Sequence, residues 1–293
     1  MKYNNHGCKR KVDHILLLLV FKILYLLDLM GKKVFILTPS QGRRIIAKGI
    51  IKLPQIQKLM NFGKIFVCRG ATNAYILEEL FLYLQINKPF QKNNFVAGQI
   101  IMGQRFGKWG FNPQMIEEEI LLNKGQIQPF TKREDEIDLF SKDDIIIKGG
   151  NALDVNGIPA VLVGGKKGGT IAALGGLALA RGIEIICPIG LEKTILGDVM
   201  ALSNIMGTTQ MELPEEGGPC GLIPMPYATV FTELDAFEIL FDCEAFHVAS
   251  GGVGGAEGCV SVLIETYDEN EMKKINQFMQ TIGEEPVYQP NIS

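Results

Sequence analysis

The sequence predicts a mixed α/β fold: a mostly parallel, Rossmann-like sheet with helices on both faces, followed by a smaller α+β unit. Three observations carry this prediction. Short apolar segments alternate with amphipathic ones between residues 33 and 190, glycine-containing turns follow several apolar segments, and a helix–strand–strand–helix order follows residue 230. Fully apolar strands that alternate with helices are typical of a parallel sheet covered on both faces.

The alternation begins at Lys33. Segments 33–38 (KVFILT) and 64–68 (KIFVC) are short, apolar and rich in β-branched or aromatic residues, so both are predicted to be strands. Gly63 stands where a helix C-cap belongs, which separates the second strand from the helix before it. Three amphipathic helices are predicted here, over residues 40–53, 54–62 and 71–84.

Residues 95–130 are polar and contain glycine, and they predict strands or loops without a clear period. The alternation then resumes. Further strands of the parallel sheet are predicted over residues 144–149, 160–165 and 183–190, and a tightly packed helix over residues 169–182.

The character of the chain changes beyond Gly197, where residues 198–230 are rich in glycine, proline and methionine. Helices are then predicted over residues 231–242 and 269–283, and strands over 245–252 and 259–267. This order favours a small α+β unit, with a ferredoxin-like arrangement as one candidate. The predicted organisation is an N-terminal extension (1–30), an α/β ligand-binding domain (31–197) and an α+β subdomain (198–293), with one fused domain as the alternative.

The N-terminal extension contains an apolar run, residues 15–30 (ILLLLVFKILYLLDLM), after a basic stretch. A membrane-spanning helix needs about 20 apolar residues, and this run is shorter and is interrupted by Lys22 and Asp28. It also lacks the small-residue cleavage site of a signal peptide. We therefore expect an extension with Met30 as a candidate start, no membrane role, and a cytoplasmic protein.

Composition narrows the class of partner. With a net charge of −3 and no aromatic-and-basic stripe, the chain lacks the basic face that nucleic-acid binding requires. The six cysteines form no C-x-x-C pair and have no histidine pair nearby, so neither a metal site nor a disulfide framework is expected. We expect a small-molecule ligand, no cofactor and no nucleic acid, and a homo-oligomer is compatible with the sequence.

Candidate binding residues follow the predicted strands, because ligands of open parallel sheets bind outside the carboxyl ends of the strands. Residues 38–44 (TPSQGRR) fit either a simple N-cap or an anion-binding turn. The next turn offers more polar groups than a structural turn needs, and its amides open a helix. Its candidate ligand-binding residues are Arg69, Gly70, Thr72 and Asn73.

The turns with the most glycine lie between residues 143 and 170, where paired glycines would let backbone amides converge on an anion. The alternative is a pair of flexible turns with close helix packing at Gly175 and Gly176. The candidate residues are Gly149, Gly150, Asn151 and Asp154 in the first turn, and Lys166, Lys167, Gly168, Gly169 and Thr170 in the second.

This layout resembles the superfamily that contains ribose-5-phosphate isomerase A, glucosamine-6-phosphate deaminase, the sugar-sensing domains of some repressors, and CoA transferases. On that resemblance, segment 69–74 (RGATNA) stands where the isomerase has its Gly-Ser-Thr phosphate loop. Segment 149–154 (GGNALD) stands in place of its Gly-Ala-Asp-Glu loop, and segment 164–170 (GGKKGGT) in place of its Lys-Gly-Gly-Gly loop. The resemblance implies a phosphorylated metabolite as ligand.

Isomerisation of a sugar phosphate needs a carboxylate to move a proton and a cation to stabilise the enediolate. Asp154 is the first candidate base, Lys166 or Lys167 the candidate cation, and Glu192 the second candidate base, with a charged first helical turn as its alternative interpretation. His247, in a predicted strand before the glycine-rich segment 250–258, fits a structural group better than a catalytic one.

Two classes of function therefore follow. As an enzyme, the protein would act on a small phosphorylated metabolite by proton transfer, or would carry out CoA-dependent acyl transfer. As a sensor, it would bind such a metabolite without turnover. No acidic residue follows Asp154 directly, which favours the sensor, and no helix-turn-helix is evident, which argues against a repressor.

Overall fold

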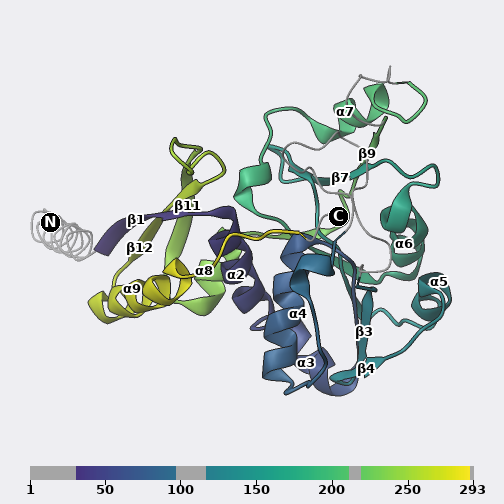
Figure 1. Ribbon diagram of the computed structural model, residues 1–293, viewed down its shortest axis with the longest axis horizontal. Helices are drawn as coiled ribbons and strands as arrows, with labels where there is room; N and C mark the ends of the chain where they lie inside the picture. Colours follow the sequence, from purple (N-terminus) through teal and green to yellow (C-terminus); the bar gives the residue numbers. More distant parts are fainter. Residues whose placement is uncertain (1–30, 97–116, 211–218, 291–293) are drawn as a thin grey trace, which may run out of the picture.

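A computed structural model describes residues 31–96, 117–210 and 219–290 of the chain and has a mixed α/β architecture (Figure 1). A six-stranded sheet with the order β10-β8-β5-β2-β3-β4 forms its centre. Two smaller sheets flank it, with the orders β1-β12-β11 and β6-β7-β9. The predicted α/β class is confirmed at this level.

The central sheet is mixed. Four of its strands run parallel: β2 (Lys64–Val67), β5 (Ile145–Ile147), β8 (Glu184–Pro188) and β10 (Thr229–Phe231). The strands β3 (Ile120–Asn123) and β4 (Gln126–Gln128) extend it in antiparallel pairing. The parallel strands β2 and β5 are almost wholly buried because helices cover both faces, which explains their continuous apolar sequences.

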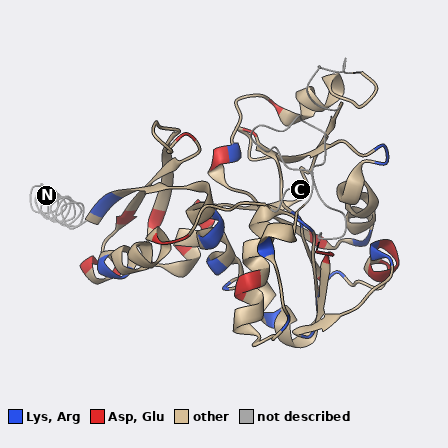
Figure 2. Ribbon diagram, viewed as in Figure 1, with Lys and Arg blue, Asp and Glu red and all other residues tan. Residues whose placement is uncertain are grey.

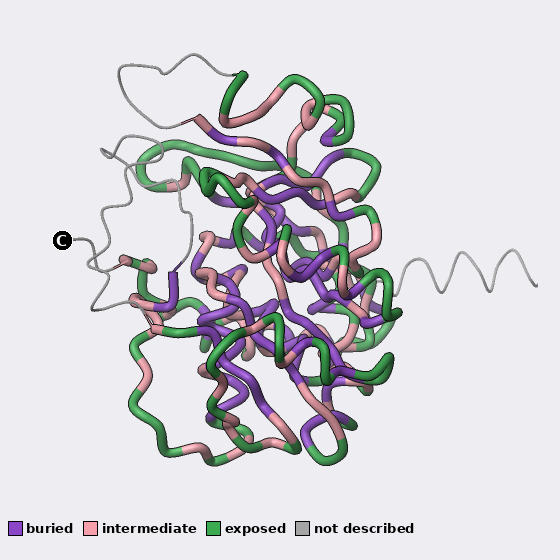
Figure 3. The backbone as a smooth tube through the Cα atoms, turned by 90° about the vertical axis from the view of Figure 1, so that its right-hand side faces the viewer, coloured by how far each residue is buried: buried purple, intermediate pink, exposed green. Residues whose placement is uncertain are grey.

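Alternate residues of these strands enter two separate cores. Ile65 and Val67 face the cluster that includes α2 (Pro39–Ile50), α3 (Pro54–Phe62) and α4 (Ala71–Tyr83). Phe66 faces the opposite cluster, under α5 (Arg133–Ile137) and α6 (Gly169–Arg181). The buried segments form the centre of the molecule and the exposed turns its outside (Figure 3).

Segment 160–165 does not join the central sheet, contrary to the prediction. Its strand β7 (Pro159–Val163) pairs antiparallel with β6 (Ala152–Leu153) and with β9 (Gly221–Pro224), beside α7 (Val199–Ile205). The connection from β6 to β7 is a short turn, whereas a parallel pair needs a crossover of a dozen or more residues. The turn therefore folds β7 back on β6.

The third sheet joins the beginning and the end of the described chain. Strand β1 (Gly31–Leu37) pairs along its whole length with β12 (Val260–Thr266), which also pairs with β11 (Glu244–Ser250). Helices α8 (Glu233–Leu240) and α9 (Glu269–Gly283) share its core with α2. Strands β9 and β10 follow residue 197 but pair with β7 and β8, which precede it. Strand β1 in turn pairs with β12 of the C-terminal part. Strand pairing therefore connects the two predicted domains, 31–197 and 198–293.

Other expectations concern the ends and the surface. Within the described ranges, no helix has both the length and the apolar character needed to cross a bilayer. The apolar run 15–30 and most of the segment 95–130 lie outside those ranges. Basic and acidic positions are interspersed over the fold (Figure 2).

Candidate functional site

Polar residues gather at the carboxyl edge of the central sheet, where the four parallel strands end. Arg69 follows β2, Lys148 follows β5, the short helix η2 (Leu191–Lys193) follows β8, and Glu233 follows β10. Helix α4 begins at this edge because it leaves β2, and α6 begins there because it leads into β8. The edge therefore combines two helix amino ends with charged side chains.

The amino end of α4 presents buried polar groups. Thr72 is 4% exposed and Asn73 is fully buried. The Nδ2 of Asn73 donates to the carbonyl oxygens of Cys68 (2.7 Å) and Ile147 (3.2 Å), so this side chain ties the end of β2 to the end of β5. Its Oδ1 has no hydrogen-bond partner, and neither have the Thr72 hydroxyl and the Arg69 Nε.

The glycine turn after β5 fits between its neighbours closely. A Cβ on Gly149 would lie 3.5 Å from the Pro188 carbonyl oxygen, an ordinary contact. A Cβ on Gly150 would lie 2.8 Å from Ile189 Cδ1 and 3.3 Å from the Ala160 carbonyl oxygen, so a larger residue there would require the Ile189 side chain to shift. Asn151 is engaged with β7, because its Oδ1 accepts the backbone N–H of Leu162 at 3.1 Å.

A cluster of charged side chains lies beside this turn. Arg43, on the second turn of α2, pairs with Glu192 at 3.6 Å between Nη2 and Oε1. The Nζ of Lys193 donates to the Gly150 carbonyl oxygen at 3.0 Å, and the Oε2 of Glu233 accepts the backbone N–H of Leu191 at 3.0 Å. Two carboxyl groups and two cations thus meet where β8 and β10 end.

The two carboxyl groups of this cluster have different environments. Glu233 is 1% exposed, and its burial, together with the negative charge of Glu192, raises its pKa to about 8. Burial also lowers the pKa of Lys193, against the opposing effect of Glu192 and with a smaller contribution from Arg43. Glu233 is therefore protonated near neutral pH and can donate a proton.

Asp154 occupies a different kind of place, in the turn between β6 and β7. Its carboxylate accepts the backbone N–H groups of Asn156 (2.9 Å), Ile158 (2.9 Å) and Val199 (3.3 Å). Burial opposes ionisation, but these hydrogen bonds outweigh it and lower the pKa of Asp154. A carboxylate so engaged stabilises the turn, whereas the Glu192 Oε1 has no hydrogen-bond partner.

The Lys-Gly turn lies at the amino end of α6. Lys166 and Lys167 are exposed, and Gly168 and Gly169 adopt positive φ angles of 73° and 62°. The Thr170 hydroxyl accepts from Arg133 at 2.6 Å and donates to the Glu119 carboxylate at 3.2 Å. Thr170 is thus already engaged with protein groups, and so is Gly168, whose N–H donates to the Gly165 carbonyl oxygen at 2.8 Å. A Cβ on Gly169, by contrast, would meet open space.

Sequence reasoning did not single out Glu119 and Arg133. Glu119 is 7% exposed and directly precedes β3, in the stretch that has no clear period. Arg133 opens the five-residue helix α5. The only available signal was a run of glutamates before three apolar residues, 120–122, and such a pattern is too common to indicate a site.

The cysteines and His247 do not add reactive groups to the edge. Cys68 and Cys187 are buried, and burial raises the pKa of both thiols, that of Cys187 to about 12. The ring of His247 bonds within its own strand, at 2.8 Å from its Nε2 to the Ser250 hydroxyl and 3.1 Å to the Ala249 carbonyl oxygen. Within the described ranges, no group of His, Cys, Asp and Glu side chains could hold a metal ion.

The glycine-rich segment between β11 and β12 forms an exposed turn. Gly251, Gly254 and Gly255 have positive φ angles, and the Glu257 carboxylate accepts the Gly255 N–H at 3.0 Å. At its base, Gly258 packs on Pro39, the first residue of α2. These contacts are those of a structural turn. The segment lies next to α2, the helix that carries Arg43.

Unsatisfied polar atoms are concentrated around this edge. Buried side-chain polar atoms almost always have a hydrogen-bond partner in native proteins. In the described part of the chain, seven such atoms have none, and they lie on α2, α4 and the short helices η1 (Lys92–Asn94) and η2 or next to them. They are Arg43 Nε, Arg69 Nε, Thr72 Oγ1, Asn73 Oδ1, Tyr75 OH, Asn93 Oδ1 and Glu192 Oε1.

Contacts between α2, α4, η1 and the C-terminal segment place the residues that carry these atoms in neighbouring parts of the fold. The Gly70 N–H donates to the Phe95 carbonyl oxygen at 3.2 Å, which places η1 beside the start of α4. Arg43 lies 5.7 Å from the ring centre of Tyr288, and that ring lies 6.1 Å from the ring of Tyr75. The region therefore offers several donors and acceptors to a ligand.

No protein-family model matches this sequence, and no curated protein does so either. The function is therefore inferred from the arrangement of polar and charged residues at the carboxyl edge of the central sheet.

Proposed function

We propose that the protein is an enzyme that binds a small phosphorylated metabolite at the carboxyl edge of its central sheet and transfers a proton within it, as an aldose–ketose isomerase does. The observation that carries this proposal is the concentration of seven unsatisfied buried polar atoms at this edge. The Rossmann-like and ferredoxin-like descriptions of the two parts of the fold remain predictions.

The phosphate binds at the amino end of α4. Gly70 caps this helix without a side-chain hydrogen bond, and the first turn has no acidic residue, so its free N–H groups favour an anion. The Arg69 Nε and the Thr72 hydroxyl supply further donors. A phosphate offers acceptors to all of these groups at once.

The rest of the ligand carries hydroxyl groups. Asn73 Oδ1 and Asn93 Oδ1 are acceptors without partners, and so is Glu192 Oε1 apart from its ion pair with Arg43. An acceptor that is buried in this way needs a donor from the ligand. A sugar phosphate has both the anionic end and the donor-rich chain that these groups require.

Glu192 acts as the base. Its carboxylate takes a proton from the carbon beside the substrate carbonyl and returns it to the adjacent carbon, while Lys193 and Arg43 stabilise the negative oxygen of the enediolate between the two steps. Glu233 donates its proton to that oxygen and regains a proton from the neighbouring hydroxyl. Lys193 takes the role expected of Lys166, which is exposed.

Ligand binding is tested by thermal shift against ribose 5-phosphate, glucosamine 6-phosphate, CoA esters, nucleotides and inorganic phosphate. We expect a selective shift with one sugar phosphate, weakened about tenfold or more in Thr72→Val, because a donor to the phosphate is lost. The matched control is Thr281→Val, on the exposed side of α9. Equal shifts for both variants would contradict the assignment of the phosphate site.

Turnover is tested by proton exchange of the bound sugar phosphate in D₂O, followed by NMR. We expect Glu192→Gln to abolish exchange and Asp154→Asn to retain it in the folded fraction, because Asp154 holds a turn. The opposite result would return the base to Asp154. Selective binding without exchange would identify a sensor, and a shift with CoA esters alone would identify acyl transfer.

A further inference from the structure

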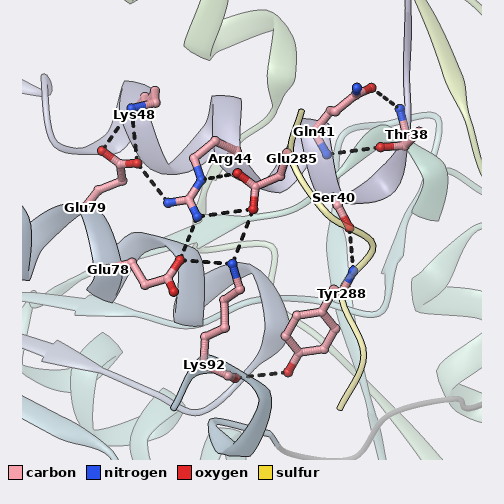
Figure 4. Close-up of polar contacts among 10 residues, drawn as sticks. All are labelled: Thr38, Ser40, Gln41, Arg44, Lys48, Glu78, Glu79, Lys92, Glu285 and Tyr288. Atoms are coloured by element: carbon pink, nitrogen blue, oxygen red, sulfur yellow. Dashed lines mark hydrogen bonds and ion pairs between the residues drawn. The ribbon is translucent and has the colours of Figure 1, made fainter. Parts of the chain in front are cut away.

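The last described residues of the chain return to the candidate site. After α9, segment 284–290 crosses α2 and reaches α4 and η1, on the side of the molecule that carries the carboxyl edge (Figures 1 and 4). No sequence pattern singles out this segment, which is short and has no period. Its two anchoring residues are Glu285 and Tyr288.

Glu285 holds the segment by charge. Its carboxylate accepts from the Arg44 Nε at 2.8 Å and from the Lys92 Nζ at 3.3 Å. Arg44 also binds Glu78 at 2.6 Å and Glu79 at 2.8 Å (Figure 4). Burial opposes ionisation of Glu285, but Arg44 and then Lys92 outweigh it and lower its pKa. The segment is thus docked at a partly buried ion network.

Tyr288 contacts three elements of the fold, α2, η1 and α4. Its backbone N–H donates to the Ser40 hydroxyl at 2.8 Å on α2, and its own hydroxyl donates to the Lys92 carbonyl oxygen at 3.2 Å on η1. Its ring packs at 6.1 Å from the ring of Tyr75 on α4. The guanidinium carbon of Arg43 lies 5.7 Å from the centre of the Tyr288 ring.

We propose that Tyr288 is a positioning residue for Arg43, and through Arg43 for Glu192, with Glu285 holding the segment that carries it. Arginine has many rotamers, and an aromatic ring beside a guanidinium group reduces their number. Arg43 has one ion pair, to Glu192 at 3.6 Å, and its Nε has no hydrogen-bond partner. The ring of Tyr288 therefore determines where the charge beside Glu192 lies.

The effect of Tyr288 on catalysis rests on the proposed function. Its effect on the position of Arg43 does not. Tyr288 acts on the base and not on the phosphate end, which α4 and Arg69 form. Loss of its ring is therefore expected to lower kcat for the sugar phosphate and to leave KM nearly unchanged.

The structural part is tested on the full chain by NMR, through exchange of the Arg43 Nε–H with water, assigned by its loss in Arg43→Lys. We expect exchange about fivefold to tenfold faster in Tyr288→Ala, because a partly buried cation–π contact is lost. Tyr288→Phe keeps the ring and is expected to stay near wild type. Val287→Ala, at an exposed residue of the same segment, is the matched control.

A second variant tests the anchor. Glu285→Gln loses the ion pairs with Arg44 and Lys92, so the exchange of the Arg43 Nε–H should accelerate to a smaller extent. Unchanged exchange in Tyr288→Ala, or equal acceleration in Tyr288→Ala and Tyr288→Phe, would overturn the inference whatever the ligand. Faster exchange in Tyr288→Ala but not in Tyr288→Phe, with no thermal shift of the wild type by ribose 5-phosphate or glucosamine 6-phosphate, would support the positioning role and count against the proposed function.

Discussion

Glu233→Gln is expected to make the protein more stable at alkaline pH relative to wild type. Glu233 is 1% exposed, and its carboxyl group contacts the backbone N–H of Leu191 and packs against Gly42. Glutamine has nearly the same shape and keeps an acceptor for Leu191, but it carries no charge. The substitution therefore isolates the cost of ionising this buried carboxyl group.

The magnitude follows from the pKa of Glu233, which burial and the charge of Glu192 raise from its ordinary value of 4.5 to about 8 in the folded protein. Between these values the folded protein holds a proton that the unfolded chain has released, so wild-type stability falls as the pH rises through this window. At about 1.36 kcal/mol for each tenfold change in proton affinity, the loss approaches about 5 kcal/mol. The glutamine variant has no such loss.

Urea unfolding between pH 5 and pH 8, under reducing conditions, measures the effect. The difference in unfolding free energy between Glu233→Gln and wild type should grow in favour of the variant by up to about 1.4 kcal/mol per pH unit. Glu244→Gln, at an exposed position of β11, serves as control and should show no such growth. Parallel curves for Glu233→Gln and wild type would refute the argument that Glu233 is protonated in the folded protein.

Two further pairs of substitutions test the packing and the ion pairs that hold the site. A Cβ on Gly49 would lie 2.8 Å from the Ala236 backbone of α8, so Gly49→Ala should destabilise by about 1–3 kcal/mol, whereas Gly176→Ala, with open space around it on α6, should stabilise by about 0.5–1 kcal/mol. Arg44→Gln removes the arginine that three carboxylates share and leaves them only Lys48 and Lys92, so it should cost about 1–3 kcal/mol. Lys142→Gln, from an exposed pair, should cost less than about 0.5 kcal/mol. Thermal and urea unfolding measure all four, and equal effects within either pair would contradict the packing described.

Local sequence determines most of the helices and strands. The predicted helix over residues 71–84 is α4, and the predicted closing helix over 269–283 is α9. These elements could be predicted because the period of apolar residues and the glycines at their ends are local properties. For the same reason, the polar turn with Thr72 and Asn73 could be found next to a strand end.

The pairing of distant segments could not be predicted. The apolar segment 160–165 fits a strand of the parallel sheet and the middle strand of a small antiparallel sheet equally well, and the turn at Asp154 decided for pairing with β6 and β9. Strand β1 pairs with β12 across more than 200 residues of sequence. Such pairings depend on the total burial of competing arrangements, which no short window of sequence contains.

The candidate site shows the same division. The sequence by itself determined the strand ends, the glycine turns and the charged residues that follow them, including Arg69 and Glu192, since these depend on neighbours along the chain. Only the tertiary structure decided that Glu233 is buried beside Glu192 and that Tyr288 packs on Arg43. The physical reason is that burial and charge pairing depend on which segments meet in space, and these segments are far apart in sequence.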